Sequence, residues 1–153
     1  MRYATLLAVL GLFTSAGLAR ADEAADKAAK ELEGLWLVVG IENEGRKATG
    51  EDVKDMRWHI QGGEIRARDP DGTAGKMSFV LDPGKDPKAI DVTSLDGKQK
   101  GKTAFGIYEL KDGRLRICLR DWESAVKGRP TKFSTEKDSG LAMITLERAK
   151  EKK

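Results

Sequence analysis

Cysteine and histidine are nearly absent from this chain, which holds one of each in 153 residues, Cys118 and His59. A single cysteine excludes a disulfide within the chain, so stability must come from packing. One histidine and one cysteine cannot build the usual zinc shells. The segment Asp69-x-Asp71-Gly72 lacks the later acidic positions of a calcium loop, and a Pro-Asp-Gly turn explains it. We therefore expect no metal site and no cofactor.

A catalytic constellation is also missing. Cys118 and His59 form the only thiolate–imidazole combination available, and no orienting third group accompanies either residue. No glycine-rich phosphate loop follows a strand. We expect a chain without enzymatic activity, in which Cys118 packs within a strand beside Ile107.

An excess of charge of one sign is lacking as well. The chain carries 28 basic and 25 acidic residues, a formal net charge of +3. A nucleic-acid partner normally requires a concentrated basic face, so we expect none. Residues 149–153 are read as a charged tail.

The only long apolar run lies at the N-terminus. Met1-Arg2 gives a positive start, residues 3–13 are apolar apart from Thr5, and Ala19-Arg20-Ala21 resembles a cleavage site. The run falls short of the ~20 apolar residues that span a bilayer. We predict a signal peptide over residues 1–21, cleaved between Ala21 and Asp22, and export to the periplasm or outside the cell. No stable membrane insertion is expected after cleavage; a buried N-terminal helix is the alternative.

What remains reads mainly as strands. A short helix or linker is expected over residues 22–33, ending before Gly34, with an apolar strand over 34–41. Gly62-Gly63 and Asp112-Gly113 each join two alternating segments into a hairpin. A last strand pair is expected over residues 131–135 and 141–146. With about eight short strands, the pattern predicts a single mainly β domain over residues 34–148, an antiparallel up-and-down barrel, with a sandwich as the alternative.

The hairpin around Asp112-Gly113 has a predicted register with two distinct faces. One face holds Tyr108 opposite Ile117, and Leu110 opposite Leu115. The other carries the side chains considered as ligand contacts: Phe105, Arg116, Cys118 and Arg120. In one interpretation this second face is the outer surface. In the other it lines the lumen and suits an acidic, partly apolar ligand.

The chain also resembles a known family over residues 32–148. Leu32-x-Gly34-x-Trp36 is similar to the Gly-x-Trp signature of lipocalin-like barrels, in which the tryptophan plugs one end. Further segments follow in order: Leu81-Asp82-Pro83, Pro87-Lys88-Ala89-Ile90-Asp91, Gly101-Lys102-Thr103, Gly106-Ile107-Tyr108-Glu109-Leu110, Leu115-Arg116-Ile117-Cys118 and Arg129-Pro130-Thr131-Lys132-Phe133. The set resembles a family of exported lipocalin-like domains of unknown function, found as large paralogous sets in planctomycete bacteria. The resemblance implies a lipocalin-like barrel and export, and it supplies no catalytic residues.

Two functions stay open at this point. The first is an exported, non-enzymatic binding domain for a small amphiphilic or acidic ligand, or for a protein partner of the cell envelope. Its core would include the structural residues Gly34, Trp36, Trp58 and Tyr108. The second is a structural or interaction module of the envelope, with a filled barrel and no ligand, whose contacts would lie on outer strands and the loop 122–129.

Overall fold

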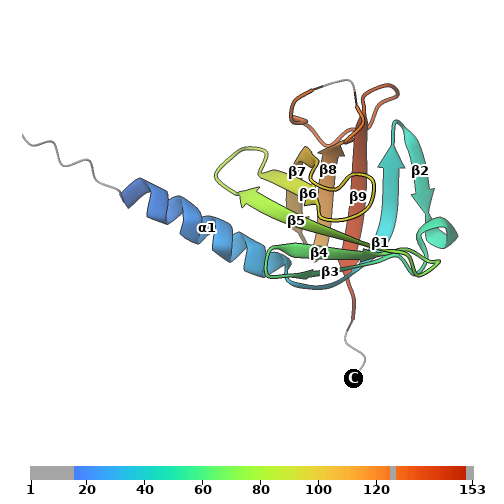
Figure 1. The fold of residues 1–153 in the computed structure, drawn as a ribbon, viewed down its shortest axis with the longest axis horizontal. Helices are drawn as coiled ribbons and strands as arrows, with labels where there is room; N and C mark the ends of the chain where they lie inside the picture. The colour runs from blue at the N-terminus through green and yellow to red at the C-terminus, as the bar shows by residue number, and fades with distance from the viewer. Residues whose placement is uncertain (1–15, 125–126, 151–153) are drawn as a thin grey trace, which may run out of the picture.

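The computed structural model describes residues 16–124 and 127–150 of the chain. It shows one β-barrel from which a single helix projects (Figure 1). Most of the predicted signal peptide, residues 1–15, lies outside the described part. In the described part of the chain, no helix combines the length and the apolar character needed to cross a bilayer.

Most elements follow one another along the chain with short connections. The elements are α1 (Ala16–Leu32), β1 (Gly34–Asn43), β2 (Arg46–Thr49), the 3-10 helix η1 (Gly50–Val53), β3 (Arg57–Gln61), β4 (Glu64–Arg68), β5 (Ala74–Asp82), β6 (Ala89–Ser94), β7 (Thr103–Lys111), β8 (Arg114–Arg120) and β9 (Leu141–Arg148). The connection between β8 and β9 is the long one.

The sheet closes on itself. Strands β1 and β3 to β9 pair in the order β1-β3-β4-β5-β6-β7-β8-β9, every pair is antiparallel, and β9 returns to pair with β1. The predicted mainly β barrel of eight strands with an N-terminal helix is confirmed. The ninth strand, β2, is extra, and it pairs with the C-terminal half of β1 beyond the point where β3 ends.

Three local details differ from the predictions. Helix α1 begins at Ala16 instead of residue 22, so it runs through the predicted cleavage junction. Residues 131–135 form no strand; β9 finds its partners in β8 and β1 instead. The segment 46–49 is a strand that the sequence reading did not include.

The hairpin between β7 and β8 has the predicted register. Tyr108 lies opposite Ile117, and Ile107 lies opposite Cys118. Asp112 and Gly113 form the two-residue turn with φ values of 53° and 73°, as this hairpin class requires. At Gly106 the strands approach so closely that a Cβ atom would lie 2.5 Å from the Cys118 carbonyl oxygen. A side chain at position 106 would therefore separate the two strands.

One end of the barrel is closed by Trp36 and the end of α1. Trp36 is fully buried, and its indole N–H donates to the Leu32 carbonyl over 2.8 Å. The Arg148 guanidinium lies over the Trp36 ring at 4.4 Å and donates to the Glu33 carbonyl at 2.8 Å and to the Glu31 carbonyl. Gly34 has a φ of 129°, and a Cβ there would lie 3.0 Å from Arg148 Nη1. Contacts between residues 31–36, at the start of the barrel sequence, and Arg148, at its end, therefore hold this end of the barrel closed.

Candidate functional site: the open mouth of the barrel

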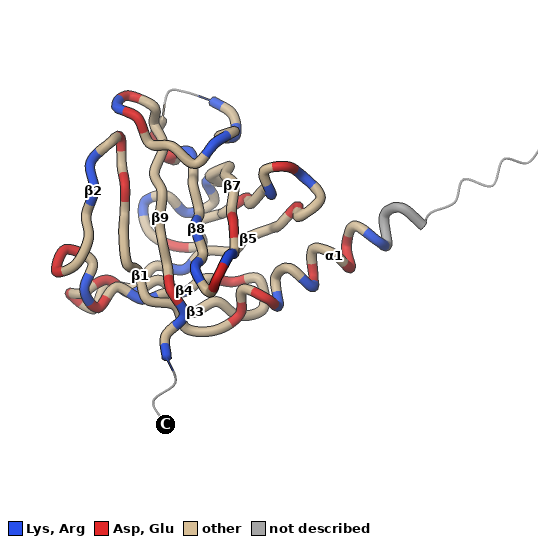
Figure 2. The backbone as a smooth tube through the Cα atoms, turned by 180° about the vertical axis from the view of Figure 1, so that it is seen from behind, with Lys and Arg blue, Asp and Glu red and all other residues tan. Residues whose placement is uncertain are grey.

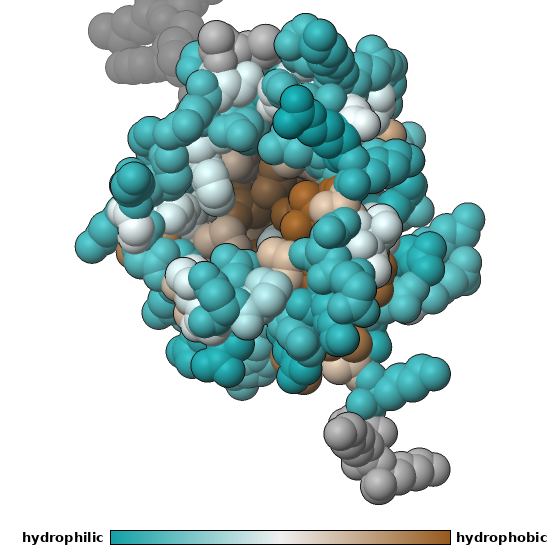
Figure 3. Space-filling view, turned by 90° about the vertical axis from the view of Figure 1, so that its right-hand side faces the viewer, coloured by the Kyte–Doolittle hydropathy of each residue, from teal (hydrophilic) through white to brown (hydrophobic). Residues whose placement is uncertain are grey.

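The opposite end of the barrel is open. The space-filling view in Figure 3 shows a hollow with a hydrophobic floor, surrounded by a largely hydrophilic rim. Antiparallel pairing brings to this end the C-terminal ends of β1, β4, β6 and β8 and the N-terminal ends of β3, β5, β7 and β9. We call this hollow the cup.

The cup is lined by apolar side chains that pack on the barrel core yet stay partly exposed. Strand register assigns to it Ile41, Ala48, Ala67, Met77 and Ile144. Met56 joins them from the residue before β3, and Trp122 from the loop after β8. Apolar side chains of this kind are normally covered completely when a barrel is filled. Their partial exposure at one end is what leaves room for a small apolar group.

The floor of the cup is solidly packed. Trp58 and Leu119 are 7% and 8% exposed, while Val92 is fully buried. Below them the core continues through Ile117 and Leu115 to the closed end. The available space is therefore confined to the mouth and does not run through the molecule.

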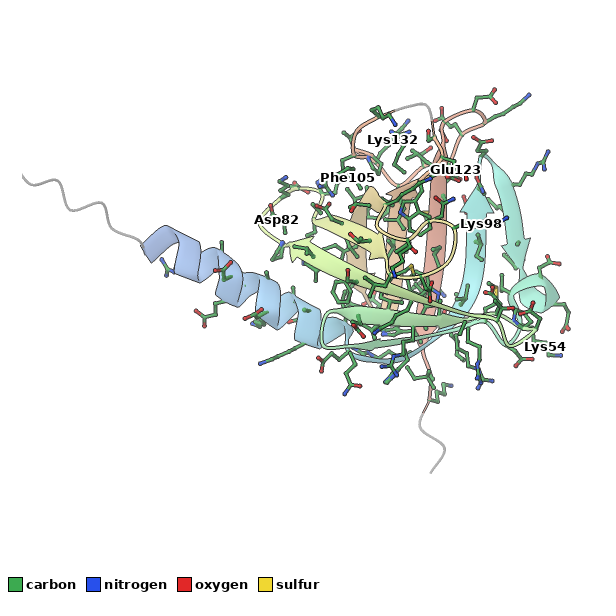
Figure 4. The ribbon with its side chains drawn as sticks, in the orientation of Figure 1. Lys54, Asp82, Lys98, Phe105, Glu123 and Lys132 are labelled. Atoms are coloured by element: carbon green, nitrogen blue, oxygen red, sulfur yellow. The ribbon has the colours of Figure 1, made fainter. Side chains whose placement is uncertain are left out.

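Two loops form part of the rim. Gln99, between β6 and β7, donates a side-chain hydrogen bond of 2.8 Å to Glu123 in the loop that follows β8. Figure 4 labels Lys98, next to Gln99, and Glu123 in these two loops. The first loop is also attached to β5, because the Asp96 carboxylate accepts a hydrogen bond of 2.9 Å from the Lys76 backbone N–H. The rim on this side is thus linked across two loops and strand β5.

Two buried polar atoms near this rim lack a hydrogen-bond partner among the described residues. They are the indole nitrogen of Trp122, a donor, and the side-chain oxygen of Gln99, an acceptor. Buried polar groups in proteins are usually paired, and leaving one unpaired typically costs ~1–3 kcal/mol. The Trp122 indole N–H would be satisfied by an acceptor, and the Gln99 oxygen by a donor.

The residues proposed from the sequence as ligand contacts lie elsewhere. Phe105, Arg116, Cys118 and Arg120 all point to the outer face of β7 and β8, while Tyr108 points into the core. The interpretation that places these four side chains in the lumen is therefore wrong. In the closed barrel, the strand register directs the other face of β7 and β8, which carries Tyr108 and Ile117, to the interior.

The outer arginines instead hold the long loop between β8 and β9. Arg120 donates to the carbonyls of Gly128, over 3.0 Å, and Ser139. Arg116 pairs with Glu109 at 3.1 Å and lies 4.6 Å from the ring centre of Phe133. These guanidinium groups are engaged by the protein's own side chains and backbone.

Arg129 also holds this loop, a role that the sequence pattern did not indicate. Its guanidinium pairs with Asp91 at 2.7 Å, donates to the Gly106 carbonyl at 2.7 Å and to the Ile90 carbonyl at 3.0 Å, and faces the Phe105 ring at 5.6 Å. Figure 4 labels Phe105 on this side of the barrel. Arg116, Arg120 and Arg129 together bind the loop to the outside of the sheet.

Cys118 is fully buried beneath that loop. Its thiol donates a long hydrogen bond of 3.9 Å to the Ser134 carbonyl, and it packs with Ile107, Met143 and Phe133. Burial raises the pKa of the Cys118 thiol. His59 is exposed on β3, which is separated from β8 in the barrel by β9 and β1. The structure does not bring the two residues together as a nucleophile and base.

Within residues 16–124 and 127–150, no group of three or more His, Cys, Asp and Glu side chains is arranged to hold a metal ion. Comparisons with protein-family models, with curated proteins and with solved structures find no match.

Proposed function

We propose that this chain is an exported, non-enzymatic lipocalin-like domain that binds a small amphiphilic ligand in the cup at the open end of its barrel. The observation that carries the proposal is the group of apolar side chains left partly exposed around one mouth of an otherwise packed barrel. An eight-stranded barrel has an interior just large enough for one small ligand.

The ligand's polar group is expected to be neutral. The cup-lining side chains named above are apolar, and Arg116 and Arg120 are engaged on the outer face. The unpaired Trp122 indole N–H needs an acceptor and the unpaired Gln99 oxygen needs a donor, and a hydroxyl or an N–H amide group supplies both. These positions favour a neutral amphiphile over the acidic ligand considered from the sequence.

A structural module without a ligand is the second candidate. The packed floor beneath the cup, with Trp58 and Val92 buried, supports it. In that case the cup would be a shallow irregularity of the barrel end, and partners would bind to the outer strands or to the loop after β8.

A neutral fluorescent probe distinguishes the two candidates. We expect the full chain to bind N-phenyl-1-naphthylamine saturably, with enhanced probe emission, because the probe is apolar and small. Ala67→Phe places a ring into the cup and should weaken binding by at least about tenfold, the cost of a lost apolar contact of ~1.4 kcal/mol. Arg66→Phe, the adjacent residue on the opposite face of β4, should bind the probe normally.

Native mass spectrometry of the chain, exported from a bacterial host and purified without detergent, identifies the ligand class. A reproducible added mass, lost on denaturation and absent from Ala67→Phe, supports the binding function. The mass of the chain alone, together with no saturable probe binding, would support the filled-barrel module. An equal loss of probe binding in Ala67→Phe and Arg66→Phe would support it as well. The same mass shows whether the chain is cleaved between Ala21 and Asp22.

A further inference from the structure

A second surface with a distinct character lies on the outer face of β1, β3, β4 and β5. Two cross-strand rows run over it: Leu35, His59, Arg66 and Lys76 in one, and Leu37, Arg57 and Arg68 in the other. We call these seven side chains the basic face. The strands that carry it are labelled in Figure 2, where Lys and Arg are blue.

The basic face concentrates positive charge although the whole chain is nearly balanced. Arg57 pairs with Asp55 at 3.3 Å, and Lys76 pairs with Glu64 at 3.1 Å. Arg66 and Arg68 are exposed and make no ion pair with any residue that the structure describes. Two guanidinium groups are therefore free to bind an anion.

The arrangement works against folding. Arg57 lies directly opposite Arg68, and Arg66 lies directly opposite Lys76. Like charges at opposed positions of an antiparallel pair destabilise the sheet. Asp55 and Glu64 offset one charge of each pair, so Arg66 and Arg68 carry the uncompensated charge of this surface.

Each row ends in an exposed leucine. Leu35 and Leu37 are 45% and 37% exposed, and they are two of the four large hydrophobic side chains that stand exposed in the described part of the chain. They point outward from β1, next to His59 and Arg57. A partner that covers this face would remove apolar area from water while neutralising the arginines.

We propose that the basic face binds the surface of an anionic phospholipid membrane. Arg66 and Arg68 bind the phosphate groups, and Leu35 and Leu37 enter the boundary between headgroups and acyl chains. A nucleic acid fits this surface less well, because its phosphates would pair with the arginines while Leu35 and Leu37 would stay exposed to water. The proposal does not depend on a ligand in the cup.

Vesicle co-sedimentation tests the proposal on the chain exported from a bacterial host, as purified for mass spectrometry. We expect binding to phosphatidylcholine vesicles that contain phosphatidylglycerol, little binding to phosphatidylcholine alone, and weakening as salt is raised. Each juxtamembrane arginine contributes about fivefold in affinity, so Arg66→Ala with Arg68→Ala should weaken binding by roughly twenty-fivefold. The matched control, Lys127→Ala with Lys132→Ala, removes the same charge from the loop after β8 and should bind normally.

Substitution of the two leucines distinguishes a membrane partner from a nucleic acid. Leu35→Ser with Leu37→Ser should weaken vesicle binding while leaving binding to a short duplex DNA unchanged, since only the membrane takes up the apolar side chains. Equal binding to both vesicle types, or equal effects of the arginine pair and the lysine pair, would overturn the proposal. Tight DNA binding with vesicle binding insensitive to the leucine changes would assign the face to a polyanion instead. Far-UV circular dichroism of every variant checks that the barrel is folded.

Discussion

At the scale of the residue, Tyr108 is the side chain with the most clearly perturbed chemistry. It is 3% exposed, its hydroxyl has no hydrogen-bond partner among the described residues, and it lies in the barrel core. Burial, assisted by the negative charges of Glu31 and Asp82, raises its pKa to about 12. The neutral phenol is thus favoured by the folded state.

This shift predicts a loss of stability at alkaline pH. In the unfolded chain Tyr108 ionises near its ordinary pKa of about 10, whereas in the fold it stays protonated up to about 12. Stability is therefore complete below about pH 10 and falls between pH 10 and 12, by about 2–3 kcal/mol. Urea unfolding at stepped pH should show this fall in the native chain and not in Tyr108→Phe. The two chains share every lysine, so a parallel loss in both would contradict the assignment.

At the scale of the element, the ends of α1 and β9 are joined by Arg148. Its guanidinium makes two hydrogen bonds to the last carbonyls of the helix and covers the Trp36 ring. We expect Arg148→Ala to lower the free energy of unfolding by about 2–3 kcal/mol, because carbonyls and an indole face lose their partner together.

Arg114→Ala provides the matched comparison for that prediction. Arg114 pairs with Glu147, next to Arg148. Both arginines are exposed, and Arg148 differs from Arg114 in its contacts with the Trp36 ring and with two backbone carbonyls. An exposed pair is worth ~0–1 kcal/mol. Arg148→Lys keeps the charge without the planar fork and should retain only part of the stability. Similar urea midpoints for Arg148→Ala and Arg114→Ala would show that Arg148 has no special role at the closed end.

The elements that the sequence predicts best are those fixed by local chemistry. Asp112-Gly113 determines the β7–β8 register, because few residues tolerate two successive positive φ values. The segment 131–135 has strand-like composition, yet it lies in a loop held to the barrel by hydrogen bonds from Arg120 to Ser139 and from Arg129 to Gly106 and Ile90, which join residues far apart in the sequence. The cup could not be predicted for a similar reason. Partial exposure of Ile41 or Met77 depends on which end of the closed barrel each occupies.

At the scale of the whole molecule, the two ends of the barrel differ in how they are closed. Trp36, the end of α1 and Arg148 cover one end, while the other is ringed by partly exposed apolar residues and loops. Local opening is easiest where few apolar contacts hold the backbone. The backbone should therefore open rarely at the closed end of the barrel and more often at the mouth.

Hydrogen exchange measured by mass spectrometry tests this asymmetry. We expect slow exchange at the closed-end halves of β1, β8 and β9 and faster exchange at the mouth, in the segments around Met77, Gln99 and Trp122. Adding the neutral fluorescent probe should slow exchange only at the mouth, because a bound molecule there replaces the missing apolar contacts. Ala67→Phe, which fills the cup permanently, should slow the mouth without the probe and remove the probe's effect. Uniform exchange at both ends, or protection by the probe at the closed end, would contradict a ligand site at the mouth and would favour the filled-barrel module.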